Sequence, residues 1–156
     1  MSVYRVAVCE DDDEVRKLIC GLCGKIYSGW GVDADIDAFD SAGDAVGEDY
    51  DLYLLDIQMP GESGIALARR LYGSGVRDRV IFITGSAEYA LDGYSAHPVH
   101  YLLKPVEREA LEGALRLAWE LRRPRTLLFR AGAKTAAFPA EDVLYLESRS
   151  HGVVLH

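Results

Sequence analysis

The sequence predicts an α/β protein with a doubly wound parallel sheet, followed by a short all-β segment. Between residues 3 and 122, short apolar stretches typical of buried strands alternate five times with helical stretches. Such an alternation gives a parallel sheet with right-handed crossovers. After residue 122, four strand-like stretches follow one another with no helical pattern between them, so the composition and the period both change there.

Each predicted strand is a short apolar stretch, and the five are residues 3–9, 32–39, 52–55, 80–83 and 100–103. The third and fourth are continuously apolar, which is typical of strands covered on both faces. The second alternates apolar with acidic residues, which indicates a strand with one exposed face.

The five predicted helices differ in the strength of their apolar pattern. The first, from residue 15 to 26, and the last, over 106–122, carry one apolar stripe at helical spacing, and 65–71 follows the same spacing. Residues 41–49 and 86–94 are expected to form short helices, although the first of these has two glycines and few apolar residues.

A change near residue 124 predicts a domain boundary. The motif Arg122-Arg123-Pro124-Arg125 ends the last helix, because proline cannot continue it. We therefore expect a first domain over 1–122, a linker over 123–125 and a second segment over 126–156. The predicted strands of that segment are 126–130, 134–138, 143–147 and 152–156.

Composition and charge limit the classes of partner. The chain is 49% hydrophobic and 27% charged, no apolar run is long enough to span a bilayer, and no secretory leader precedes the first strand. We expect a cytoplasmic protein without membrane contact. Residues 1–122 carry 12 Lys and Arg against 22 Asp and Glu, whereas 123–156 carry 5 against 3. Any DNA contact is therefore expected from the second segment or beyond it.

Three cysteines, Cys9, Cys20 and Cys23, make an odd count. The C-x-x-C spacing of the last two falls inside a helical pattern, so plain thiols are favoured over a metal or redox site.

Polar side chains follow four of the predicted strands directly. They are Glu10, Asp11, Asp56, Thr84 and Lys104. Because parallel strands end at one edge of a sheet, these side chains are expected to converge. Three carboxylates repel one another unless a cation lies among them, and oxygen ligands suit Mg²⁺. Together with the ammonium, the set fits phosphoryl transfer.

Most of these positions also have a purely structural interpretation. The acidic run 12–14 stabilises the start of the first helix. Thr84 is a common strand residue, and Lys104-Pro105 could form a plain turn. Asp56 has little structural reason to be acidic, because a buried carboxylate is costly without partners.

The chain closely resembles the response-regulator receiver family over residues 3–122. The motifs that carry the resemblance are Val8-Cys9-Glu10-Asp11-Asp12, residues 51–61 ending in Met59-Pro60-Gly61, Ile81-Phe82-Ile83-Thr84-Gly85 and Tyr101-Leu102-Leu103-Lys104-Pro105. In this order they are highly specific, although each alone is weak. The resemblance implies a flavodoxin-like sheet of strand order 2-1-3-4-5.

The resemblance implies a chemical role for the residues around Asp56. Asp56 would be the phosphoacceptor and would attack phosphorus in line. A Mg²⁺ or Mn²⁺ ion would bind to Asp11, Asp56 and the backbone carbonyl of Gln58, with Glu10 as a direct or water-mediated ligand.

The resemblance also implies a switch. Thr84 would donate a hydrogen bond to the new phosphoryl oxygen, and Lys104 would pair with it. Tyr101 would swing inward as Thr84 moves, although a plain packing role for this ring stays open.

Residues 55–61 and 84–90 look most like receivers attached to LytTR-type DNA-binding domains, and residues 127–156 resemble the first strands of such a domain. A sensor histidine kinase would be the phosphoryl donor, DNA the target, and phosphorylation would favour a homodimer. The DNA-facing loop would contain Arg149, Ser150 and His151, with an exposed hairpin turn as the alternative. Since a LytTR domain would continue past residue 156, we expect either part of a longer regulator or a degenerate protein that does not bind DNA by itself.

Three positions depart from the usual pattern of the family. Glu10 stands where aspartate is commoner, which lengthens the reach to a metal. Gly85 after the threonine leaves an open approach to the phosphoryl group, and His100 replaces a frequent acid and would make the switch sensitive to pH.

These observations favour a two-component response regulator that is not an enzyme beyond its own phosphorylation and dephosphorylation. A signalling module that acts through protein contacts alone is the second hypothesis. A metal-dependent phosphohydrolase is disfavoured, because Gln58 stands where its acid/base aspartate would be. A receiver that never accepts phosphate is disfavoured by the complete set of acceptor, acidic, hydroxyl and lysine residues.

Overall fold

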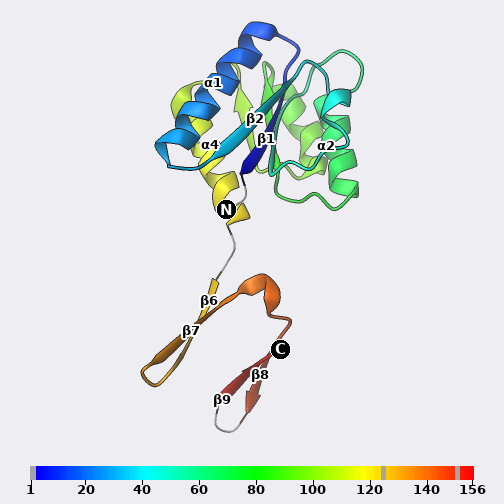
Figure 1. Ribbon diagram of the computed structural model, residues 1–156. Coiled ribbons are helices and arrows are strands. Elements are labelled where there is room, and N and C mark those ends of the chain that lie inside the picture. Colours follow the sequence, from blue (N-terminus) through cyan, green and yellow to red (C-terminus); the bar gives the residue numbers. More distant parts are fainter. Residues whose placement is uncertain (1–2, 124–125, 150–151) are drawn as a thin grey trace. The chain divides into compact units, whose positions relative to one another are not determined.

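The computed structural model describes residues 3–123, 126–149 and 152–156 (Figure 1). The chain divides into two compact units, residues 1–121 and 122–156. The division lies next to the expected linker 123–125, of which residues 124–125 fall outside the described residues. In the described part of the chain, we find no helix with the length and apolar content that a membrane crossing requires.

The first unit is built on a five-stranded parallel sheet of order β2-β1-β3-β4-β5, which confirms the expected fold. Its strands are β1 (Tyr4–Cys9), β2 (Ala34–Phe39), β3 (Leu52–Asp56), β4 (Val80–Thr84) and β5 (His100–Leu103). The strand order reverses beside β1, between the neighbours β2 and β3. Ligand sites of open α/β sheets form at such a point, outside the carboxyl ends of the strands.

Helices cover both faces of this sheet (Figure 1). They are α1 (Asp13–Gly29), α2 (Gly64–Gly73), the four-residue α3 (Ala90–Gly93) and α4 (Arg108–Arg122), with short 3₁₀ turns η1 (Gly43–Ala45), η2 (Ala87–Tyr89) and η3 (Tyr94–Ala96). The N-terminal cap of α1 is Asp12, whose side chain accepts hydrogen bonds from the backbone of Glu14 and Val15. For Asp12, this cap is a structural role at the start of the helix, where the sequence suggested one for the whole acidic run.

Alternate residues of the central strands enter two separate cores. On one face, Val8 and Leu54 pack with Ile19 of α1 and Leu115 of α4. On the other face, strand residues pack with α2, η1 and η3; they include Ala7, Cys9, Tyr53, Leu55 and Phe82. Burial on both faces explains why β3 and β4 are continuously apolar.

The helix expected over residues 41–49 is reduced to the single turn η1, so this prediction was wrong. Gly47 has a φ of +107°, which a right-handed helix does not allow. Ala42 and Ala45 are buried, but Val46 is 44% exposed. With so little apolar surface to bury, a longer helix has no stabilising face.

The short helix expected over 86–94 is also different in the structure. The segment forms η2, α3 and η3 in succession, and only residues 90–93 are α-helical. Leu91 and Tyr94 are 85% and 78% exposed, so the apolar residues do not form one buried stripe. Such a segment lacks the tertiary packing that stabilises most helices.

The second unit consists of two antiparallel strand pairs. In one pair β6 (Thr126–Ala131) lies beside β7 (Lys134–Pro139), and in the other β8 (Leu146–Arg149) lies beside β9 (Gly152–Leu155). The strand predicted over 143–147 instead starts at Leu146, and residues 143–145 connect it to the turn η4 (Ala140–Asp142). The amides of Leu144 and Tyr145 still bond to His156 and extend the second pairing.

Burial of two thiols predicts a loss of stability at alkaline pH. Burial raises the pKa of Cys9 and that of Cys23 from 9.0 to about 12. Because the folded pKa is the higher one, the stabilisation is complete below pH 9 and is lost as the pH rises toward 12. We expect the Cys9→Ala/Cys23→Ala variant to lose stability less steeply between pH 8.5 and 10.5 in urea unfolding. Equal slopes for variant and wild type would contradict this assignment.

Candidate phosphoryl-transfer site

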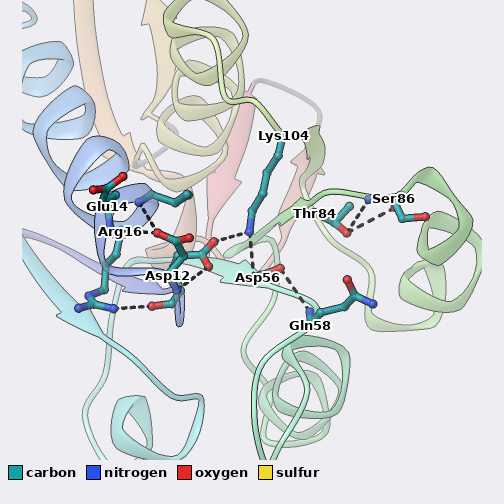
Figure 2. Close-up of polar contacts among 10 residues, drawn as sticks. Asp12, Glu14, Arg16, Asp56, Gln58, Thr84, Ser86 and Lys104 are labelled. Carbon is teal, nitrogen blue, oxygen red and sulfur yellow. Dashed lines mark hydrogen bonds and ion pairs between the residues drawn. The ribbon is translucent and has the colours of Figure 1, made fainter.

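The predicted site residues that follow β1, end β3 and follow β5 come together at the carboxyl edge of the sheet. Figure 2 shows Asp56 and Lys104 at this edge. Register places Cys9 opposite Leu55, Asp56 opposite Ile83, and Thr84 opposite Leu103. The residues that follow Cys9 and Leu103 therefore flank Asp56 from its two sides. This edge is where the reversal of strand order leaves room for a ligand.

Asp56 is the central carboxylate of the site. It ends β3 and is 4% exposed. Its Oδ2 lies 3.0 Å from Lys104 Nζ, and its Oδ1 accepts a hydrogen bond of 3.3 Å from the backbone N–H of Gln58. The negative charge is thus held by two donors, one of which is a cation, and such pairing is what allows a carboxylate to stay buried.

Glu10 lies beside Asp56 and is 1% exposed. Its Oε1 accepts a hydrogen bond from the backbone N–H of Asp12 at 3.0 Å, while Oε2 lies 2.6 Å from Lys104 Nζ. The latter contact is an ion pair whose angle falls outside hydrogen-bond geometry, so Oε2 has no well-aligned donor. Burial raises the pKa of Glu10, and the ammonium of Lys104 opposes this shift.

Lys104 is the positive charge that Glu10 and Asp56 share. Burial lowers its pKa, but the bonds with these two carboxylates outweigh burial, so that the net pKa is raised and the ammonium stays charged. The residue follows β5 directly, and the Lys104–Pro105 peptide bond is cis. Its backbone N–H also bonds to the carbonyl of Thr84 at 2.8 Å, which fixes the start of the side chain next to β4.

Asp11 completes a cluster of three carboxylates. One ligand atom from each of Glu10, Asp11 and Asp56 lies within 4.8 Å of the others, and Asp11 is exposed. Oxygen donors at this spacing fit a hard cation that keeps part of its water shell. The poorly aligned Oε2 of Glu10 is a buried acceptor that such a cation would satisfy.

Thr84 is fully buried, but its hydroxyl is directed away from Asp56 in this structure. Its Oγ1 accepts a hydrogen bond from the backbone N–H of Ser86 at 3.2 Å and contacts the Ser86 carbonyl at 3.4 Å (Figure 2). A bond from Thr84 to a phosphoryl group would require this contact with Ser86 to break. A Cβ added at Gly85 would meet no atom within 4 Å, so the approach expected beside Thr84 is open.

Tyr101 lies inward against the second of the two cores, the one that contains Tyr53, Leu55 and Phe82. Its ring is 5.3 Å from that of Phe82 between centroids, and its hydroxyl donates to the Tyr89 carbonyl at 2.7 Å. A Cβ on Gly93 would lie 2.8 Å from the Tyr101 hydroxyl, so this inward position requires glycine there. Burial raises the pKa of Tyr101 to about 12, with a smaller contribution from Asp92. The switch role stays a prediction, and so does the pH sensitivity of His100.

Two residues that position the site were not singled out from the sequence. Arg16 of α1 donates from Nη1 to the Glu10 carbonyl at 2.8 Å (Figure 2), and Gly64 begins α2 directly against the Asp56 backbone. No sequence signal separates Arg16 from an ordinary exposed helix residue. Gly64 follows Ser63, the N-cap, at a place where many residue types are acceptable.

Gly64→Ala is expected to disrupt the site. A Cβ at this position would lie 2.1 Å from the Asp56 carbonyl oxygen, so the backbone of the acceptor residue would have to move. We expect a loss of about 1–3 kcal/mol in the free energy of unfolding. Urea unfolding compares it with Gly73→Ala in the same helix, where the added Cβ meets no atom within 4 Å. Equal stability of the two variants would contradict the close approach.

The residues proposed for DNA contact cannot be placed as a site. Ser150 and His151 lie outside the described residues, and Arg149 is described only as the last residue of β8. The role of these three residues therefore stays a prediction.

Comparisons with known proteins agree with this arrangement. The family model described as the response regulator receiver domain matches residues 6–116. The positive alginate biosynthesis regulatory protein of Pseudomonas aeruginosa is 44% identical over 68 residues, which cover 44% of this chain and 27% of that protein. The transcriptional regulatory protein DltR of Streptococcus agalactiae is 30% identical over 115 residues, covering 72% of this chain and 50% of that protein. The chain thus spans half or less of the length of these relatives.

Solved structures share the fold of the first unit. The response regulator protein TrrA from Thermotoga maritima, in complex with Mg(2+)-BeF, has a TM-score of 0.64 at 24% identity, over 74% of this chain and 99% of that one. The response regulator StyR has a TM-score of 0.64 at 27% identity, over 77% and 61%. Since the family model covers more than two thirds of the sequence, and the sheet order and the acidic edge are those expected, the chain belongs to the response regulator receiver domain family.

Proposed function

We propose that this chain is the receiver of a two-component response regulator, in which Asp56 accepts a phosphoryl group from a sensor histidine kinase. The observation that carries the proposal is the buried Asp56 carboxylate, held 3.0 Å from the Lys104 ammonium and within 4.8 Å of the carboxylates of Glu10 and Asp11. A buried acid among two other acids is costly for stability. A phosphoryl-transfer reaction at this edge gives that cost a functional reason.

In the proposed reaction Asp56 acts as nucleophile. One Asp56 oxygen forms a bond to phosphorus, the bond from phosphorus to the histidine nitrogen of the kinase breaks, and the imidazole leaves with the electron pair. Lys104 pairs with the transferred group, and the Thr84 hydroxyl donates to it once its contact with Ser86 breaks. Water later attacks phosphorus, which releases inorganic phosphate and restores the carboxylate. Beyond these two reactions of its own side chain, the chain is a signalling protein and not an enzyme.

A divalent cation, Mg²⁺ or Mn²⁺, fits the acidic cluster. Glu10, Asp11 and Asp56 would hold it with their carboxylates, and Gln58 with its backbone carbonyl. When bound, such an ion neutralises charge on the transferring group. The structure of TrrA in complex with Mg(2+)-BeF supports this assignment by analogy of fold.

Uptake of one phosphoryl group from acetyl phosphate tests the proposal. Intact-protein mass spectrometry is expected to show one added group in the presence of Mg²⁺ and none with EDTA. Size-exclusion chromatography of the same samples measures whether phosphorylation drives a homodimer. A chain that gains no group, or gains it equally without metal, would overturn the proposal.

We further propose a LytTR-type DNA-binding output for the whole regulator. Two observations support this proposal. The four short strands β6 to β9 follow the receiver, and the relatives include proteins named as transcriptional regulators. A signalling module that acts through protein contacts alone is the competing function. Gel-shift measurements with duplex DNA, on the phosphorylated and the unphosphorylated protein, distinguish the two, because only the DNA-binding output predicts a shifted complex.

A further inference from the structure

A second set of contacts leads from Asp56 to Tyr101 by way of Tyr89. Gln58 donates its backbone N–H to Asp56 Oδ1 at 3.3 Å, and its side-chain Nε2 donates to the Tyr89 hydroxyl at 2.7 Å. The backbone carbonyl of Tyr89 in turn accepts a hydrogen bond of 2.7 Å from the Tyr101 hydroxyl. Tyr89 therefore joins the loop that follows Asp56 to β5, and each of its two bonds uses a different part of the residue.

The segment that carries Tyr89 is weakly packed. Residues 87–96 form the short turns η2, α3 and η3, and the largest apolar side chains at its middle, Leu91 and Tyr94, are 85% and 78% exposed. Segments with so few buried contacts open locally at a small cost in free energy. Hydrogen bonds from neighbouring elements therefore contribute much of the stability of this segment's position.

Those bonds come from two sides of the segment. Arg69 of α2 donates to the Ser95 hydroxyl at 2.9 Å and to the Asp92 carbonyl at 3.1 Å. On the other side, Tyr89 packs against the second core and meets Gln58. A cleft of about 530 Å³ lies here and is lined by Gln58 and Tyr89 among other residues. The pair therefore borders open space into which either side chain can turn once the bond is broken.

We propose that Tyr89 is a positioning residue that holds residues 87–96 against the loop after Asp56, residues 57–63, until Asp56 is phosphorylated. The inference rests on the proposed function. A phosphoryl group adds about two negative charges next to the atom that the Gln58 N–H contacts. The loop that carries Gln58 rearranges around this group, its side chain leaves the Tyr89 hydroxyl, and the segment is released together with the partner of Tyr101. In this way Tyr89 links the state of Asp56 to the position of the 87–96 segment.

Tyr89→Phe removes the hydroxyl and keeps the ring, so it tests the bond without creating a cavity. Hydrogen–deuterium exchange of residues 87–96 in the unphosphorylated variant is expected to be about three- to ten-fold faster than in wild type, the effect of losing one hydrogen bond. Beryllofluoride with Mg²⁺ is expected to accelerate this exchange in wild type and to add less in Tyr89→Phe. The global unfolding midpoint is expected to stay unchanged, which separates a positioning role from a structural one.

Two comparisons make the test specific. Tyr94→Phe alters an exposed tyrosine of the same segment and is expected to exchange like wild type. Gln58→Ala/Tyr89→Phe is expected to exchange no faster than either single variant, because both changes remove the same bond.

Two results would overturn the role of Tyr89 alone: exchange in Tyr89→Phe equal to that in wild type, or additive effects in the double variant, while wild-type Asp56 still takes up a phosphoryl group. A wild type that takes up none would overturn the proposed function and with it the release step. The exchange of the unphosphorylated protein is measured without metal or donor, so the two failures are distinguishable.

Discussion

Asp56→Asn is expected to abolish uptake of a phosphoryl group from acetyl phosphate, to below detection by mass spectrometry. The amide lacks the nucleophilic carboxylate oxygen, although it has nearly the same size and can still accept the hydrogen bond from Gln58. It also removes one of three negative charges that lie within 4.8 Å of one another. The fold is therefore expected to persist, and circular dichroism checks this.

A second acidic residue at the same edge provides the control. Asp12 caps α1 with its side chain, and asparagine caps a helix about as well as aspartate. Asp12→Asn is therefore expected to label like wild type. Labelled Asp56→Asn protein would contradict the assignment of the acceptor, and loss of label in both variants would point to a general effect of charge at this edge.

The position of the site could be predicted from the sequence because it depends on topology. In a parallel sheet, a residue that follows a buried strand lies at the carboxyl edge whatever its neighbours do. Glu10, Asp56 and Lys104 each follow such a predicted strand. In the structure, both carboxylates lie within ion-pair distance of the Lys104 ammonium. The continuous apolar runs of β3 and β4 made the ends of these two strands easy to locate in the sequence, since both faces of each strand are buried.

The parts that could not be predicted depend on tertiary contacts between distant residues. The bond from Gln58 to Tyr89 spans 31 positions of sequence, and no local pattern indicates it. Gly64 has a sequence context that suits many residues, and only the Asp56 carbonyl explains its identity. The helix expected over 41–49, which forms only one turn, and the one expected over 86–94, which is divided into short turns, differ from the prediction for the same reason: both segments bury too little surface to stabilise a regular helix.

Lys104→Met is expected to destabilise the metal-free protein by about 2–4 kcal/mol, because two buried carboxylates then lack their shared cation. Methionine keeps the unbranched stem and the volume, so the loss reports charge and not packing. Glu10 and Asp56 are 1% and 4% exposed, which leaves water little access to either. Mg²⁺ is expected to restore stability, and its effect on the thermal midpoint is expected to be larger in Lys104→Met than in wild type.

The pH dependence gives this prediction a second measurement. The pKa of Glu10 is already raised by burial in the wild type, and without the ammonium it is expected to rise further. A group whose folded pKa is raised costs stability as the pH increases through that value, so the deficit of Lys104→Met is expected to shrink from pH 7 toward pH 5. The control is Lys17→Met, which removes an exposed ammonium paired with Asp13 and is expected to cost much less stability than Lys104→Met. Equal losses in the two variants, or a deficit that neither Mg²⁺ nor acid relieves, would show that Lys104 does not compensate the buried carboxylates.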